Sequence, residues 1–204
     1  MGEMYMTRGQ LVLLAVIVEV LLGMIALVGG WLLKLPMGDW LVWSFTGLLW
    51  GLGGTVALLA ILLLCRRFPV GPIGKLMGLV DERVAPIFRE CQLIDLLVIA
   101  VLAGFGEELL FRGLVQGGLE CWLVPWWGES GGTMGGIVVA SVVFGVAHPI
   151  SREYAVFATV VGLLLGWLAV VTGDLLASMV AHAGYDFVAL LILTKQRGEA
   201  REPD

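Results

Sequence analysis

The sequence predicts an all-α fold, a polytopic membrane helix bundle of about six transmembrane helices. Hydrophobic residues occupy 59% of the 204 positions and charged residues only 14%, whereas a soluble domain carries roughly 25% charged residues. The mean hydropathy is +0.98, so lipid must be the solvent for much of the surface. The apolar residues also form long runs, and the basic residues gather between particular runs.

Six apolar segments account for these runs. A spanning helix needs about 20 mostly apolar residues. The first segment is too long for the apolar core of a signal peptide, and the fourth is the shortest. In chain order the predicted spans are 11–33, 40–64, 93–119, 136–149, 154–172 and 174–194.

Two segments between the spans are predicted to be loops. Residues 66–92 hold five basic residues and three prolines, so we expect a surface loop with a short amphipathic piece. Residues 122–136 are rich in glycine and tryptophan and connect the third and fourth spans. The chain is thereby divided into two spans and a cytoplasmic loop (1–92), a core of four spans (93–194) and a charged tail (195–204).

The basic residues support this count of spans. Ten of the 12 Lys and Arg residues fall on the side of both termini, only Lys34 falls on the other, and Arg112 lies within a span. The positive-inside rule places the basic side in the cytoplasm. We therefore expect an integral protein of the plasma (inner) membrane with both termini cytoplasmic. The net charge of −5 and the lack of a basic arm exclude nucleic acid as an expected partner.

The third span carries ionisable residues at membrane depth, where each costs about 2.5–3.5 kcal/mol on insertion scales. Glu108 and Arg112 are four residues apart with the acid first, an arrangement that favours an ion pair along a helix. Successive helical residues point about 100° apart, so Glu107 is not expected to share that face. Ala103 and Gly104 would leave space beside its carboxylate. We interpret Glu108 and Arg112 as structural and Glu107 as free to act.

Two further clusters hold both histidines of the chain. Phe144 and His148 precede a proline, which disfavours helix at the residue before it, so His148 is expected at a helix end. His182 and Asp186 are four residues apart and share a helix face. One histidine in a span is often structural, but two histidines with an aspartate and the unpaired Glu107 are hard to explain by packing. We expect these side chains to converge on one site.

Three other acids are interpreted as structural. Glu19 is a lone acid in the first span, where a hydrogen bond between helices explains it better than catalysis does. Asp95 and Asp174 lie at the ends of spans, where solvation is cheap, and we treat them as boundary residues.

The order EExxxR, FxxxH and HxxxD, each in a separate span, resembles the CPBP family. These are the CAAX prenyl protease and bacteriocin-processing intramembrane endopeptidases, also called the Abi family. The resemblance covers about 93–194, half of the chain, as its catalytic core. It implies an endopeptidase that hydrolyses peptide bonds of membrane-associated proteins or peptides in the lipid bilayer. The matching residues are Glu107, Glu108, Arg112, Phe144, His148, His182 and Asp186.

The resemblance also implies roles for these residues. A carboxylate in a desolvated pocket can act as a general base near neutral pH, and the first glutamate, here Glu107, would activate water with help from His148. His182 and Asp186 would stabilise the oxyanion. Many members carry asparagine at the last position, and an ionised aspartate cannot donate a hydrogen bond. Asp186 must then be protonated, or it must orient and charge His182.

Other catalytic interpretations stay open but are weaker. Glu107, His148 and His182 would form a His₂Glu set of the kind that binds zinc in some proteases. Because no HExxH motif or nearby cysteine accompanies them, we expect no cofactor, with Zn²⁺ as the alternative. The sequence GESGG at 128–132 matches GxSxG, yet no strand precedes Ser130 as a nucleophile elbow requires.

An aspartyl protease and a protein without catalytic activity are the two remaining classes. Tyr185 and Asp186 match the YD motif of aspartyl intramembrane proteases, but the second motif of that class, GxGD, is absent. Buried acids and histidines also build proton relays, so a non-catalytic membrane scaffold or a proton-coupled transporter is the alternative function. Transporters often show an internal repeat, and we find none.

Overall fold

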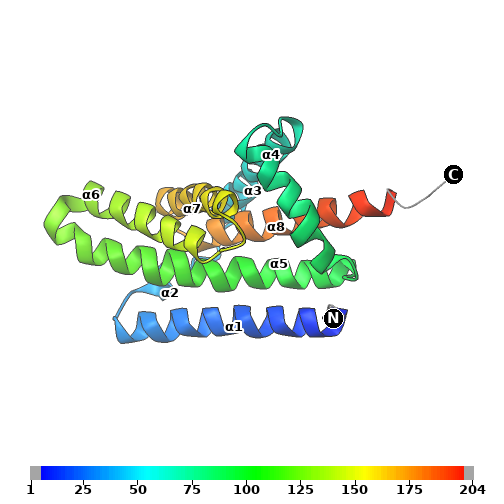
Figure 1. Ribbon diagram of the computed structural model, residues 1–204. Coiled ribbons are helices and arrows are strands. Elements are labelled where there is room, and N and C mark those ends of the chain that lie inside the picture. Colours follow the sequence, from blue (N-terminus) through cyan, green and yellow to red (C-terminus); the bar gives the residue numbers. More distant parts are fainter. Residues whose placement is uncertain (1–5, 200–204) are drawn as a thin grey trace.

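The computed structural model describes residues 6–199, with side chains for 6–195, and this part of the chain is helical without strands (Figure 1). The predicted all-α fold is confirmed. In order, the elements are α1 (Arg8–Leu32), α2 (Met37–Trp40), α3 (Phe45–Arg67), α4 (Pro72–Leu79), the π-helix η1 (Val80–Val84), the 3₁₀-helix η2 (Ala85–Phe88), α5 (Leu93–Glu108), the π-helix η3 (Leu109–Gln116), α6 (Gly117–Val146), α7 (Arg152–Thr172) and α8 (Leu175–Glu199).

Four helices are long and apolar enough to cross a membrane, namely α1, α3, α7 and the part of α8 up to Lys195. Their outer surfaces carry large apolar side chains; Leu13 is 60% exposed and Trp31 is 77% exposed. Such exposure suits lipid, because a monomeric soluble protein rarely leaves a contiguous apolar surface of this extent open to water. Two further helical rods, 93–127 and 129–146, complete the polytopic bundle.

The predicted loop at 122–136 is wrong. Residues 93–127 form one continuous rod through α5, η3 and the first part of α6, and the chain reverses at Gly128, where φ is 70° and ψ is 172°. Glycine adopts positive φ without steric cost, so a single residue makes the turn. Gly132 then packs directly against Val124, because small residues let neighbouring rods approach closely. The segment predicted as the fourth span, 136–149, is therefore part of a helix that runs from 129 to 146.

The predicted surface loop at 66–92 is mostly helical. Pro72 occupies the start of α4, where its missing N–H would have no partner anyway. Leu76 and Met77 are buried against Leu62 of α3. The amphipathic piece is therefore longer than expected, and it covers one end of the bundle (Figure 1).

The second span also begins later than predicted. Residues 37–40 form the separate helix α2, and α3 begins after Ser44, whose hydroxyl accepts from the Gly47 N–H at 2.8 Å. Asp174, interpreted as a solvated boundary residue, is buried. Its carboxylate accepts from the Val42 N–H at 3.1 Å, the Ser44 hydroxyl at 2.9 Å and the Leu176 N–H at 2.9 Å. Asp174 thus ties the start of α8 to the start of α3.

Helix α8 is the central helix, and α3, α5 and α7 pack around it. Its closest neighbour is α3 along a strip that we call the α3–α8 seam, formed by Gly51 and Gly54 of α3 against Val180 and Ala181 of α8. A Cβ atom at either glycine would collide with these side chains. The Thr55 hydroxyl also donates to the Val180 carbonyl at 3.3 Å. Small residues and a hydroxyl are the usual means of close helix packing in lipid.

Helix α1 begins and α8 ends at the same end of the bundle, and the Gly128 turn lies at the opposite end (Figure 1). Arg8 joins the starts of α1 and α5 through an ion pair in which its Nε atom lies 2.6 Å from Asp95 Oδ2. Part of the predicted charged tail, 195–199, continues α8. Residues 200–204 lie outside the described residues.

This arrangement predicts the sidedness of the connections. Reporter fusions at Gly128 and after residue 204 should report opposite sides of the membrane, because the two points lie at opposite ends of the bundle. A fusion at the exposed Gly71 should report the same side as the carboxyl-terminal fusion, since the basic 66–92 stretch lies on that side. A common side for Gly128 and Gly71 would contradict the arrangement.

Candidate active site

Glu108 is the last residue of α5 and is completely buried. Its Oε2 atom accepts from Arg112 Nε at 3.1 Å, as the four-residue spacing predicted, although the intervening turn belongs to the π-helix η3. Its Oε1 atom lies 2.9 Å from His182 Nδ1. Both carboxylate oxygens are therefore held by neighbouring side chains, which leaves Glu108 little freedom to accept a proton from a substrate or water.

Glu107 precedes Glu108 but faces a different partner. Its Oε2 atom lies 3.8 Å from His148 Nε2 and makes no hydrogen bond within the described residues. This separation exceeds a direct hydrogen bond, so a third group can lie between the two side chains. Gly104, expected to leave open space nearby, instead packs against Ala183 of α8. The open space beside Glu107 is lined by Ala103.

His148 follows the end of α6, as its position before a proline predicted. Its Nδ1 atom lies 2.7 Å from the Phe144 carbonyl oxygen. A carbonyl only accepts, so Nδ1 carries the proton in the neutral ring and Nε2 remains free to accept. The hydrogen bond thus fixes the ring with its accepting nitrogen toward Glu107.

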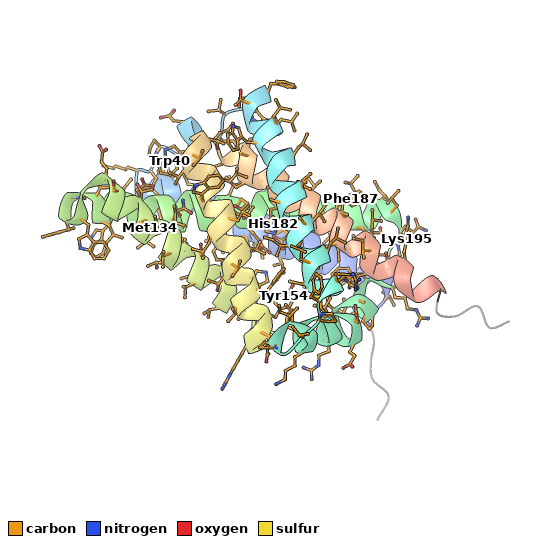
Figure 2. The ribbon with its side chains drawn as sticks, turned by 90° about the horizontal axis from the view of Figure 1, so that it is seen from above. Trp40, Met134, Tyr154, His182, Phe187 and Lys195 are labelled. Carbon is orange, nitrogen blue, oxygen red and sulfur yellow. The ribbon has the colours of Figure 1, made fainter. Side chains whose placement is uncertain are left out.

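His182 lies near the centre of the bundle (Figure 2). Its ring stands between two carboxylates: Nδ1 contacts Glu108, and Nε2 lies 3.5 Å from Asp186 Oδ2. Two flanking negative charges favour a positively charged ring that donates from both nitrogens.

Phe144 fills the space between these groups. Its ring meets Phe111 edge to face at a centroid distance of 5.0 Å and His182 at 5.8 Å. The Arg112 guanidinium carbon lies 5.2 Å from the same ring, within the range of a cation–π contact. Phe144 therefore packs against both the His182 ring and the Arg112 guanidinium, which explains why an aromatic residue precedes His148 by one turn.

A cavity of about 80 Å³ is lined by these groups. Since a water molecule takes about 30 Å³ in the liquid, the cavity has room for one or two. The four residues that were expected to converge all lie on its walls, namely Glu107, His148, His182 and Asp186. The full set of lining residues is Glu107, Phe144, His148, Tyr154, Phe157, Ala158, Val161, His182, Tyr185 and Asp186.

A second, larger cavity of about 330 Å³ adjoins the first and shares with it Glu107, Tyr154, Phe157, Tyr185 and Asp186. Its other walls are mostly apolar and come from α3, α4, η1, η2, α5 and α8. Glu19 is its remaining acid, with Oε2 against Gly106 and no hydrogen bond to that atom from the described residues. Neither tyrosine was predicted from the sequence to be a catalytic or supporting residue, although Tyr185 directly precedes Asp186.

The alternative sites receive no support from the geometry. Within the described residues, no three His, Cys, Asp or Glu side chains are arranged to hold a metal ion. Of the His₂Glu set considered for zinc, Glu107 Oε2 and His148 Nε2 lie 3.8 Å apart, and both ring nitrogens of His182 face carboxylates. Ser130 is exposed just after the Gly128 turn.

Carboxylates and imidazoles meet in a cavity inside a polytopic helix bundle, an arrangement that can supply a general base and a hydrogen-bond donor to a substrate. A family model described as Type II CAAX prenyl endopeptidase Rce1-like matches residues 89–188, a segment that contains all three motifs. Through this segment the chain belongs to the Rce1-like family, as the resemblance predicted, and it is a membrane endopeptidase. No curated protein and no solved structure matches the chain.

Proposed function

We propose that the protein hydrolyses peptide bonds in membrane-associated protein or peptide substrates, with Glu107 as the base that activates water. The observation that carries the proposal is the difference between neighbouring carboxylates. Glu107 faces His148 across 3.8 Å on the wall of a small cavity, whereas Glu108 is held by Arg112 and His182. Only the first is free to take a proton.

The reaction follows from these positions. Glu107 takes a proton from water while the water oxygen bonds to the carbonyl carbon, and the carbonyl electron pair moves to oxygen. His148, which accepts at Nε2, holds the second hydrogen of the water. The carbon–nitrogen bond then breaks as Glu107 returns the proton to the leaving amine. Base and acid are thus the same carboxyl group in successive steps.

His182 is the group that stabilises the oxyanion in this proposal. A ring charged by its two carboxylate neighbours donates from Nε2 to the developing negative oxygen. The contact of Asp186 with this nitrogen at 3.5 Å supports the second role considered for Asp186, in which it orients and charges His182. An ionised Asp186 does not itself donate to the oxyanion.

The substrate enters, we propose, through the 330 Å³ cavity. Its apolar walls suit the apolar part of a membrane-associated substrate, and Glu107 lies where the two cavities meet. The cavity lies toward the α4 end of the bundle, to which the basic 66–92 stretch belongs. We therefore propose that the protein works in the plasma membrane with its termini and its substrate entrance on the cytoplasmic side.

Quantitative proteomics of membranes tests this function. Membranes that contain the wild-type protein should lose intact substrates and gain truncated products, and membranes with Glu107→Gln should not. Glu129→Gln is the matched control, because Glu129 is exposed and lies outside the site. Identical peptide profiles for wild type and Glu107→Gln, together with proton flux in liposomes, would favour a transporter instead.

We also propose that the reaction needs no metal ion, with Zn²⁺ held by Glu107, His148 and His182 as the alternative. The lack of a three-ligand arrangement supports this choice. Dialysis against 1,10-phenanthroline should therefore leave peptide cleavage by the purified protein unchanged. A loss of activity that added Zn²⁺ restores would show that the metal-free mechanism is wrong.

A further inference from the structure

The oxyanion of the proposed reaction needs hydrogen-bond donors, and the walls of the 80 Å³ cavity offer few of them. The Nδ1 proton of His148 is used by the Phe144 carbonyl, and both ring nitrogens of His182 face carboxylates. Apart from these rings and the carboxyl groups, the polar side chains on the walls are those of Tyr154 and Tyr185. The two phenol hydroxyls are therefore the donors that the existing contacts leave for a substrate.

Both tyrosines lie where the two cavities of the site meet, because each lines the 80 Å³ cavity as well as the 330 Å³ cavity. Both residues are partly buried. Neither hydroxyl forms a hydrogen bond with another of the described residues. Since a phenol stays protonated near neutral pH, each hydroxyl can donate to a group that enters from the larger cavity.

The ring contacts of the two tyrosines differ. Tyr154 lies at the start of α7 (Figure 2), and its ring stacks on His148 with the centroids 6.2 Å apart and the planes inclined by 27°. Its backbone N–H donates at 3.1 Å to the hydroxyl of Ser151, the cap of α7. The short connection between α6 and α7 therefore holds Tyr154 beside the histidine that faces Glu107. Tyr185 instead packs against the apolar cluster around Leu58 of α3.

We propose that Tyr154 is a further catalytic residue, whose hydroxyl donates a second hydrogen bond to the oxyanion. The inference rests on the proposed hydrolytic function. In that reaction His182 donates only from Nε2, and Asp186 also contacts this nitrogen at 3.5 Å. A tyrosine hydroxyl is one of the neutral side-chain donors that form oxyanion holes, and it brings its proton to the carbonyl oxygen without giving the proton up.

The expected effect of this donor is on the chemical step. As the water oxygen bonds to the carbonyl carbon, the carbonyl electron pair moves to oxygen, and the hydrogen bond from Tyr154 strengthens with the growing negative charge. An interaction that is stronger in the transition state than in the bound substrate raises kcat and leaves KM nearly unchanged. A residue that only packed against His148 would not show this division.

Cleavage of a detergent-solubilised peptide by the full chain tests the proposal, with Tm measured on the same samples. Tyr154→Phe keeps the ring and its stacking but loses the hydroxyl, so kcat should fall by about 10²–10³-fold with KM and Tm close to wild type. Tyr185→Phe is the matched comparison, because it removes the same group from the same wall. Its kcat should fall by less than about tenfold, the most that an ordinary neutral hydrogen bond contributes.

A second substitution of Tyr154 separates catalysis from packing. Tyr154→Leu removes the ring as well, so kcat should be at least as low as in Tyr154→Phe and Tm should also fall. Wild-type kcat in Tyr154→Phe with a loss only in Tyr154→Leu would show that the residue is structural and overturn the proposal. A larger loss of kcat in Tyr185→Phe than in Tyr154→Phe would also overturn it.

The same assay distinguishes this proposal from the proposed function. If wild-type cleavage depends on Glu107 and Tyr154→Phe is unimpaired, the hydrolytic function stands and only the role of Tyr154 is wrong. If the wild-type protein shows no cleavage that Glu107→Gln removes, both are wrong.

Discussion

Glu107→Gln is expected to abolish peptide hydrolysis and to leave the protein folded. Glutamine keeps the size of the side chain and can still form hydrogen bonds, but an amide cannot take a proton from water near neutral pH. General-base catalysis contributes about 10²–10⁴-fold, so cleavage should fall by at least about 100-fold. The buried Oε2 atom of Glu107 has no hydrogen bond to lose within the described residues, and the variant should be as stable as wild type or more stable.

The measurement is cleavage of a detergent-solubilised peptide by equal amounts of folded protein, with Tm determined on the same sample. Glu129→Gln again serves as the control and should keep wild-type activity. An active, folded Glu107→Gln variant would refute the glutamate-base mechanism. If Glu107→Gln is active and Glu108→Gln is well folded and inactive, the roles of the two glutamates are reversed.

Glu108→Gln should instead lower stability. The substitution removes the charge that compensates the fully buried Arg112 and also weakens the bond to His182. Breaking one partner of a buried pair costs about 3–5 kcal/mol, which corresponds to a fall of about 6–20 °C in Tm for a chain of this size. Folded yield and thermal unfolding in the same detergent measure the loss, and any loss of activity should follow the loss of folded protein.

A double-mutant cycle separates the ion pair from other effects of the substitution. If the charge on Arg112 is the cause, Glu108→Gln combined with Arg112→Gln should be less destabilising than the sum of the single substitutions. Strictly additive effects would show that Glu108 stabilises the protein in some other way.

The sequence predicted the fold class because hydropathy is a property of each segment alone. Its main error, the loop at 122–136, arose from glycines such as Gly132 and Gly136 that favour loops by composition. In the structure they allow close contact between two helical rods, a tertiary effect that local patterns do not contain. The helices within 66–92 were not predicted for a related reason. Pro72 starts the helix α4, which is stabilised by burial against α3 and not by a local sequence pattern.

The same distinction between local patterns and tertiary contacts applies to the candidate site. The pair Glu108 and Arg112 could be predicted from a spacing of four residues, and so could the face shared by His182 and Asp186. The bond between Glu108 and His182 joins residues 74 positions apart, and it depends on how α5 meets α8. The position of Glu19 beside the larger cavity could not be predicted either, because no residue near it in the sequence indicates a partner.

The α3–α8 seam has a consequence for any attempt to isolate the catalytic half of the protein. The matched segment begins at residue 89, after the end of α3, yet Val180 and Ala181 lie on the face of α8 that α3 covers. A fragment made of residues 89–188 would expose this face to lipid and leave Asp174 without its two partners before α3. We therefore expect the family segment not to be an autonomous folding unit, and co-expression with residues 1–88 as a separate chain should restore its assembly.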